Sequence, residues 1–203
     1  MKFHKIKHKI ASKIILNLYF NSWRIFIYKN IYKYDIGKNV KIGRSLINSE
    51  IVFIGDNSTI GNNNHISCKT FKMGNDSKII SKNRIIGKSN FSIGNNSRII
   101  SDHYIDCWND VGIGNHTWLA GIGSQIWTHG SLHTKTGKKL DVKLGNGIYI
   151  GSGCCIAPGV SIKDDCLIGL GSVITTSFDT ENCLIAGNPA KLVKAEINWR
   201  KNW

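Results

Sequence analysis

Acidic residues are scarce in this sequence. Its 203 residues hold 13 Asp and Glu against 27 Lys and Arg, which gives a formal net charge of +14. Residues 1–41 carry nine Lys and one Arg against a single acid, Asp35, and so contribute +9 of that charge. A region this basic can be a solvated end, or it can bind acidic phospholipid, an anionic glycan or nucleic acid. We expect no nucleic-acid partner.

A long apolar run is also missing. The longest apolar piece, Ile14 to Phe20, is interrupted by Asn17 and is far shorter than the ~20 residues of a membrane-spanning helix. No small-residue cleavage site follows it, which argues against a secretory signal. Apolar residues do recur every four positions among the lysines of residues 1–35, namely Ile6, Ile10, Ile14 and Leu18. This spacing predicts a basic amphipathic helical arm that lies on a membrane surface or packs on the main body.

The cysteines lack the spacing of a metal or redox motif. No C-x-x-C pair occurs among the six, and two of them are adjacent: Cys68, Cys107, Cys154, Cys155, Cys166 and Cys183. This usage is typical of small core residues in a reducing cytoplasm. We therefore predict a cytoplasmic protein, associated with the membrane at most through its basic arm at the inner face.

One short phrase recurs through most of the chain. It is an aliphatic residue followed by glycine, and it begins at Ile36, Ile54, Met73, Ile93, Ile113 and Ile150. The first five occurrences lie 18, 19, 20 and 20 residues apart. A finer step of six links further aliphatic residues, as in the run Ile150, Ile156, Ile162, Ile168 and Ile174. Three steps of six make one 18-residue coil.

A period of six excludes an α-helix, whose apolar face repeats near 3.6 residues, and a simple hairpin sheet, which alternates. Short strands that turn a corner every six residues instead form a triangular prism, with one aliphatic residue per side pointing to the axis. Gly or Asn after the aliphatic residue suits the corner, because both tolerate left-handed backbone angles. Since the chain has only two prolines, few positions interrupt the stacking.

The pattern resembles the left-handed parallel β-helix of the hexapeptide-repeat acyltransferases over residues 36–193. The closing phrases are the most similar, and the most specific of them is Ala186-Gly-Asn-Pro-Ala-Lys191. The resemblance implies an all-β solenoid domain at 36–193, between the basic arm at 1–35 and a C-terminal tail at 194–203. It also implies an acyltransferase that uses acetyl-CoA, works as a homotrimer with the donor in the groove between adjacent prisms, and requires no metal.

The six-residue rhythm breaks once, between about residues 125 and 147. Residues 124–134 read SQIWTHGSLHT, and a solenoid accommodates such a polar excursion as a loop that leaves the prism. Acyl transfer to a hydroxyl needs a base, a task that suits histidine because its ordinary pKa lies near neutrality. In the resembling family a Thr-His-Pro-like phrase supplies this base. Thr128-His129-Gly130 fits that position, so the resemblance implies that His129 is the catalytic base.

The coil before this loop is unusually polar and aromatic. Residues 101–110 read SDHYIDCWND, where a scaffold would use small residues. Asp106 follows the inward Ile105, and we expect it to orient the imidazole of His129. The residues expected to contact the acceptor are Asp102, His103 and Trp127 and, from the resemblance, His133.

Coenzyme A is a long chain with phosphates at one end, so its binding calls for backbone amides along the arm and cations at the phosphates. The resemblance places these contacts in the last coils, where Leu170 departs from the small residue commoner in the family. The implied cofactor residues are Gly151, Ser152, Gly169, Leu170, Thr175, Lys191 and Lys194.

Other functions stay open at this point. Sugar-nucleotide N-acyltransferases share the fold, but they commonly carry an added N-terminal domain for which residues 1–35 are too short. A zinc hydratase would hold its metal with three histidines, and His103, His129 and His133 are candidates. A non-catalytic solenoid could serve as an adaptor through the basic arm. We favour an O-acetyltransferase that acts on a hydroxyl of a sugar or polysaccharide, such as a cell-surface glycan.

Overall fold

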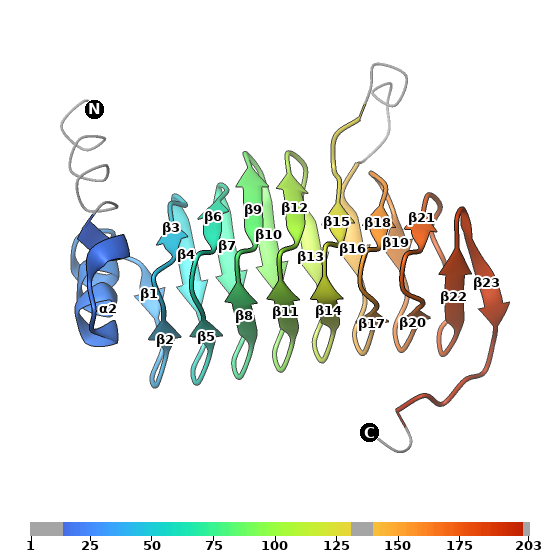
Figure 1. The fold of residues 1–203 in the computed structure, drawn as a ribbon, viewed down its shortest axis with the longest axis horizontal. Helices are drawn as coiled ribbons and strands as arrows, with labels where there is room; N and C mark the ends of the chain where they lie inside the picture. Colours follow the sequence, from blue (N-terminus) through green and yellow to red (C-terminus); the bar gives the residue numbers. More distant parts are fainter. Residues whose placement is uncertain (1–13, 131–139, 201–203) are drawn as a thin grey trace.

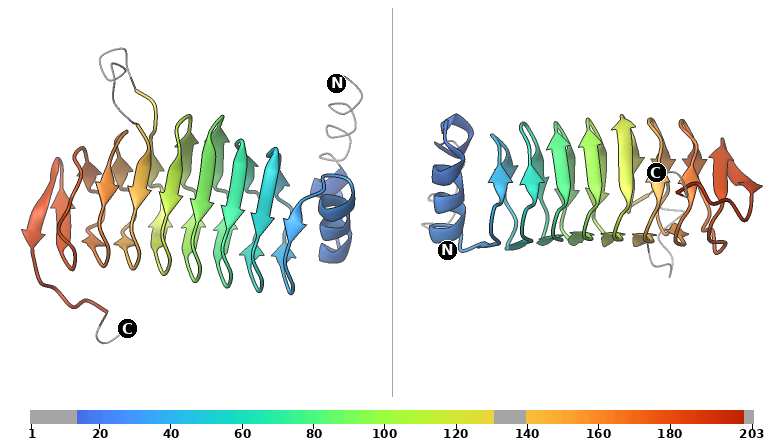
Figure 2. Two further views of the ribbon diagram at one scale, coloured as in Figure 1. Left: turned by 180° about the vertical axis from the view of Figure 1, so that it is seen from behind. Right: turned by 90° about the horizontal axis from the view of Figure 1, so that it is seen from below.

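The computed structural model describes residues 14–130 and 140–200, which form a β-helix capped at one end by a helix (Figure 1). The chain winds in successive coils, and each coil adds one strand to each of three sheets. Two further views show an elongated prism with the helix at one end and the C-terminal strands at the other (Figure 2). The predicted left-handed parallel β-helix of hexapeptide repeats is confirmed.

Apart from β23, the strands of each sheet follow one another in parallel along the prism. The first sheet comprises β1 (Asp35–Ile36), β4 (Ile51–Ile54), β7 (Thr70–Met73), β10 (Asn90–Ile93), β13 (Val111–Ile113), β16 (Val142–Leu144) and β19 (Ser161–Ile162). The second comprises β2 (Lys41–Ile42), β5 (Thr59–Ile60), β8 (Lys78–Ser81), β11 (Arg98–Ser101), β14 (Trp118–Ile122), β17 (Tyr149–Ile150), β20 (Leu167–Ile168), β22 (Leu184–Gly187) and β23 (Ala190–Lys194). The third comprises β3 (Leu46–Ile47), β6 (His65–Ser67), β9 (Arg84–Gly87), β12 (Tyr104–Cys107), β15 (Gln125–Ile126), β18 (Cys155–Ile156) and β21 (Val173–Ile174).

The aliphatic residues spaced by six build the core. In the third sheet, Ile66, Ile85 and Ile105 stack in register on one another, and each is 0% exposed. The other two sheets contribute equivalent columns, so the axis of the prism is filled by side chains from every coil. Each fully buried isoleucine stabilises the fold by roughly 1.5–3 kcal/mol, and the regular column explains why so short a strand suffices.

The glycine of the recurring phrase is needed for a different reason from the one expected. Gly55 does not have a positive φ angle; the left-handed residue of this corner is Asn57, with φ 57°. A Cβ atom on Gly55 would lie 2.6 Å from the backbone nitrogen of Asn75 in the next coil. The glycine therefore permits the close approach of neighbouring coils, while the asparagine accepts the left-handed backbone.

Helix α2 (Asn21–Asn30) covers the open edge of the first coil. The Asn21 side-chain oxygen accepts from the Ile42 N–H at 2.7 Å, and Arg24 Nε donates to the Ile42 carbonyl at 2.7 Å. The hydroxyl of the buried Tyr28 donates to and accepts from the backbone around β3 at 2.9 and 3.0 Å. These side chains make hydrogen bonds to backbone N–H and C=O groups on the open edge of the first coil, which a preceding coil would otherwise pair. Helix α2 therefore packs on the main body. No described helix is long and apolar enough to cross a membrane.

The far end of the prism closes with a reversal of the chain. Strand β23 runs antiparallel to β22, so the last strand folds back instead of adding a coil. Lys191 and Lys194 lie on this returning strand. The chain then continues along the prism, where the Trp199 indole donates to the Asp165 carbonyl at 3.0 Å.

Strands β15 and β16 stand on either side of the excursion predicted at about 125–147. Both are paired within their sheets, so the residues up to Ile126 and those from Val142 onward belong to the prism. The Leu140 carbonyl accepts from the Gly159 N–H at 3.1 Å, which places the end of the excursion beside the next coil. Residues 131–139, including His133, lie outside the described residues, as do 1–13 and 201–203.

Candidate active site

His129 and Asp106 meet at one edge of the prism, the edge where the third sheet passes to the first, here called the 3–1 corner. His129 follows β15, and Asp106 belongs to β12 in the preceding coil. The two strands pair with Ile105 opposite Ile126, so the residues after each isoleucine reach the same corner. His129 Nδ1 lies 2.7 Å from Asp106 Oδ2. The structure thus brings together the two residues expected as base and orienter.

The Asp106 carboxylate is held by several donors. Its Oδ2 accepts from the Thr128 N–H at 3.0 Å and lies 2.9 Å from the Thr128 hydroxyl, in addition to the imidazole contact. Oδ1 is buried and has no hydrogen-bond partner among the described residues. The aligned position in the coil before is Ile86, an apolar residue. A buried carboxylate with one unpaired oxygen costs stability, so the stacking of the coils alone does not explain this residue.

The geometry of the pair suits proton transfer. The His129 side chain is 47% exposed and the Asp106 side chain 0%. A carboxylate at Nδ1 favours the tautomer that carries its proton on that nitrogen. The lone pair of Nε2 is then free to accept a proton from a bound ligand.

Two tryptophans flank the imidazole of His129. The ring of Trp127 lies 6.0 Å from it and the ring of Trp108 5.8 Å from it, between centroids. Trp108 is 43% exposed and has the Lys88 ammonium 4.3 Å from its ring centre. Sequence reasoning expected Trp127 here but missed Trp108 and Lys88. The spacing of the coils could have found them, because the register of β9 and β12 pairs Gly87 with Cys107 and so places Lys88 beside Trp108.

A groove continues along the same corner into the next coils. It encloses about 460 Å³ and is lined by Leu140, Pro158, Gly159, Val160, Thr175, Thr176 and Ser177. The Trp127 N–H donates to the Ile156 carbonyl, and the Ala157 N–H to the Ile174 carbonyl, so these coils stack directly on that of His129. Of the residues expected to bind the donor, Thr175 lies here. The groove therefore lies on the same corner as His129, in the coils that follow it.

The other residues expected to bind the donor lie elsewhere. Gly151 and Ser152 follow β17, and Gly169 and Leu170 follow β20, which places them where the second sheet passes to the third, the 2–3 corner. A Cβ atom on Gly151 would lie 2.8 Å from the Leu170 Cα, so this glycine allows the coils to approach. The Leu170 side chain is 82% exposed. One chain alone therefore does not join these residues to His129, because the third sheet separates the two corners.

His103 lies inside the prism, which overturns its expected contact with an acceptor. It is 1% exposed, and its Nδ1 accepts from the Ser124 N–H at 3.0 Å. Asn64 and Asn83 occupy this place in the two preceding coils, and the Asn83 side-chain oxygen accepts from the His103 N–H at 3.0 Å. His103 continues this inward ladder because its Nδ1 can replace an amide oxygen as acceptor. It cannot share a surface metal with His129.

The burial of His103 predicts that the free energy of unfolding falls at acidic pH. Burial lowers the pKa of His103 to about 4, so between about pH 6.5 and pH 4 the unfolded chain binds a proton that the folded chain does not. Stability is therefore lost as the pH falls through this window, by up to about 3 kcal/mol. The variant His103→Asn, which restores the residue of the preceding coils, should lose this component. Urea unfolding of both proteins near pH 7.5 and near pH 5 measures it, and identical pH dependence would contradict the assignment.

Asp102 is exposed but lies at the wrong corner for the expected acceptor contact. It occupies the 2–3 corner with a left-handed backbone, φ 57°, directly after β11. The whole of β12 separates it from the 3–1 corner. A short side chain at this place does not reach the ligand side of His129 within one chain.

Known proteins are similar to parts of this sequence and to its fold. No family model matches the sequence. Over 59 residues it is 41% identical to the galactoside O-acetyltransferase of Escherichia coli (strain K12), a segment that makes up 29% of this chain and 28% of that protein. Over 58 residues it is 33% identical to a chloramphenicol acetyltransferase of Agrobacterium fabrum, which is 29% of this chain and 27% of that protein. The chain is similar to acetyltransferases.

The extent of these matches is limited, because the chain spans less than a third of the length of either curated relative. Among solved structures, the fold resembles that of the polysialic acid O-acetyltransferase OatWY, with 28% sequence identity and a TM-score of 0.42. That match covers 82% of this chain and 90% of the other. The resemblance to acetyltransferases that the recurring phrases indicated is confirmed.

Proposed function

We propose that this protein transfers the acetyl group of acetyl-CoA to a hydroxyl of a sugar or polysaccharide. The observation that carries the proposal is the contact between the exposed imidazole of His129 and the buried carboxylate of Asp106, beside a groove. The similarity to acetyltransferases supports the reaction class, and the galactoside relative supports a sugar acceptor.

In the proposed reaction, His129 Nε2 accepts the proton of the acceptor hydroxyl while the hydroxyl oxygen attacks the thioester carbonyl carbon. The carbon–sulfur bond then breaks, and the proton passes from Nε2 to the departing thiolate. Asp106 holds the imidazole in place and stabilises its transient positive charge. The products are an acetyl ester and coenzyme A.

The acceptor is proposed to lie against the two tryptophans that flank His129. Aromatic faces suit the apolar faces of sugar rings. The variant Trp108→Ala should raise the KM for the acceptor by about tenfold, because it removes a half-exposed ring worth roughly 0.5–1.5 kcal/mol beyond its area, and it should leave the KM for acetyl-CoA unchanged. Steady-state kinetics with each substrate varied in turn measure both constants. A larger effect on the donor KM would assign Trp108 to the donor side instead.

A homotrimer would complete the site. His129 and the groove lie at the 3–1 corner, whereas Gly151, Ser152, Gly169 and Leu170 lie at the 2–3 corner. If these residues do bind the donor, a second copy must bring its 2–3 corner to the first copy's 3–1 corner. That contact is head-to-tail, and three prisms can close it into a ring. Sedimentation of the intact chain tests the state, since a monomer that is fully active would contradict the shared site.

An acceptor screen tests the activity itself. The full-length protein is incubated with radiolabelled acetyl-CoA and a panel that pairs neutral and acidic glycans with amino sugars, and transfer is scored on each. Alkali-labile label identifies an ester, and alkali-stable label an amide, which separates O-transfer from the N-acyltransferase alternative.

We also propose a cytoplasmic location with peripheral membrane contact. Acetyl-CoA as donor supports the location, and the +9 charge of residues 1–41 supports attraction to an anionic membrane face. Fractionation of cells that express the full chain, with and without a salt wash, tests both points.

A further inference from the structure

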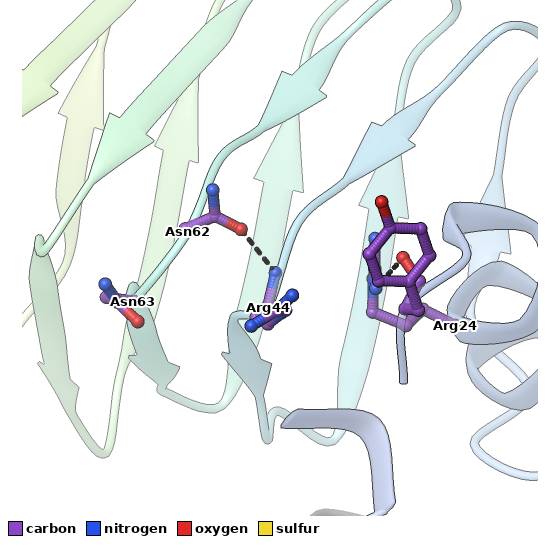
Figure 3. Close-up of a pocket in the computed structure, with 5 residues that line it drawn as sticks. Arg24, Arg44, Asn62 and Asn63 are labelled. Carbon is purple, nitrogen blue, oxygen red and sulfur yellow. Dashed lines mark hydrogen bonds between the residues drawn. The ribbon is translucent and has the colours of Figure 1, made fainter. Parts of the chain in front are cut away.

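A second polar pocket lies at the capped end of the prism. It encloses about 430 Å³ and is lined by Tyr19, Arg24, Arg44, Asn62 and Asn63. Figure 3 shows Arg44, Asn62 and Asn63 on neighbouring turns of the chain, on the side where Arg24 emerges from α2. Guanidinium and amide groups are hydrogen-bond donors, and their convergence suits an anion that carries several acceptor oxygens.

The two arginines of this pocket have no acid to neutralise them. Within residues 14–130 and 140–200, neither Arg24 nor Arg44 has a carboxylate oxygen within 4.0 Å. Arg24 is 6% exposed, and its Nε and Nη1 donate to backbone carbonyls, which fixes the guanidinium in place. Burial, and next the nearby Arg44 cation, lower the pKa of Arg24. Cations held close together without a counter-ion favour the binding of an anion.

Exposed aromatic side chains gather on the segment that caps the prism, which also supplies Tyr19 and Arg24 to the pocket. Tyr19, which lines it, is 77% exposed, and Phe20, Trp23 and Phe26 are 61%, 62% and 63% exposed. Trp23 and Phe26 also line an apolar groove on α2. Aromatic residues beside basic ones are typical of surfaces that rest in the interfacial layer of a membrane.

We propose that the pocket of Arg24 and Arg44 binds the phosphate group of an anionic phospholipid, while Phe20, Trp23 and Phe26 enter the bilayer interface. The guanidinium of Arg44 can donate two parallel hydrogen bonds to phosphate oxygens, and the Asn62 and Asn63 amides can add others. Charge selects this occupant over a second copy of the chain, because a second copy would present the same positive surface.

This docking would orient the proposed active site. His129 belongs to the fifth coil, because β15 is the fifth strand of the third sheet. At about 4.8 Å per coil, it lies roughly 20 Å beyond the first coil. A glycan linked to a membrane lipid could extend over that distance to the 3–1 corner. This consequence, unlike the lipid site, rests on the proposed acetyl transfer.

Vesicle co-sedimentation of the full chain tests the proposal. Vesicles of phosphatidylcholine with about 30% phosphatidylglycerol are expected to bind at least tenfold more protein than phosphatidylcholine alone. Lys41→Gln, the matched control, removes an exposed charge from the same coil but outside the pocket, and should weaken binding about fivefold at most. Arg44→Gln should weaken vesicle binding about tenfold more than Lys41→Gln does. Arg44→Lys should have an intermediate effect, because lysine keeps the charge but lacks the forked guanidinium.

The outcomes separate the possibilities. If Arg44→Gln and Lys41→Gln weaken vesicle binding equally, diffuse charge explains the attraction. The pocket is then overturned as the lipid-binding site. Binding of inorganic phosphate that depends on Arg44, with no binding to vesicles, would overturn the lipid as its source. Arg44 is exposed, and only its backbone N–H contacts Asn62, at 2.8 Å, so the variant should fold normally. Trp23→Ala, which removes an exposed ring of α2 that does not line the pocket, should weaken vesicle binding severalfold without changing phosphate binding.

Discussion

Replacement of His129 by alanine is expected to lower kcat for acetyl transfer by a factor of about 10² to 10⁴, the usual contribution of a general base. The imidazole is half exposed, and its one hydrogen bond within the described residues is to Asp106, so its loss should leave the fold and the affinity for acetyl-CoA unchanged. Single-turnover transfer and isothermal titration with acetyl-CoA measure the two quantities. A variant that keeps near-full activity would remove His129 from the reaction.

Two controls sharpen this experiment. His65→Ala removes a histidine from the same sheet, in β6, three coils before β15. It should leave kcat unchanged, which separates the chemistry of one imidazole from the general loss of a surface histidine. Free imidazole added to His129→Ala should restore part of the activity, because the space between Trp108 and Trp127 is then vacant. Failure to rescue together with lost donor affinity would indicate structural damage.

Replacement of Asp106 by asparagine is expected to lower kcat by about 10²-fold or more, without a matching change in either KM. The amide lacks the charge that stabilises the imidazolium, and its NH2 group can donate to Nδ1 and leave the proton on Nε2. An Nε2 that already carries a proton cannot act as the base. Steady-state kinetics measure the loss, and urea unfolding of the variant measures any change in stability.

The double variant distinguishes a positioning role for Asp106 from a structural one. If Asp106 acts through His129, then His129→Ala combined with Asp106→Asn should be no slower than His129→Ala alone, because residues that act as a unit are not additive. If Asp106 only stabilises the coil through Thr128, the two losses should multiply. Multiplied losses with a lowered unfolding midpoint would overturn the positioning role.

Much of the fold was predictable from spacing alone. The inward positions of Ile66, Ile85 and Ile105 follow from a period of six that needs no knowledge of distant contacts. The tail end was less predictable, because the Asn188-Pro189 turn does not by itself show that β23 returns antiparallel to β22. The glycine of the recurring phrase was expected to adopt a left-handed backbone, but it is needed for the close approach of the next coil. The sequence of one coil does not show how near the next coil lies.

The site was predictable in part. His129 and Asp106 were expected to meet and do, but His103, two residues before the inward Ile105, turns into the core where asparagines stand in earlier coils. Consecutive side chains of a strand point to opposite faces, so a shift of one position exchanges core and surface. Coils of unequal length hide that shift, as in β14, whose extra residue displaces its pairing with β11.

By itself the sequence determined that this chain builds a prism and that one loop leaves it, because stacking of like on like at a fixed step is a local property of the chain. The tertiary structure alone decided which polar residues share a corner. It set Trp108 and Lys88 in line with His129, placed Gly151 and Leu170 across the third sheet from it, and gathered Arg24 with Arg44 at the capped end. These contacts depend on the lengths of the coils and on the helix that covers the open edge of the first coil. Both effects arise only when segments distant in the sequence pack together.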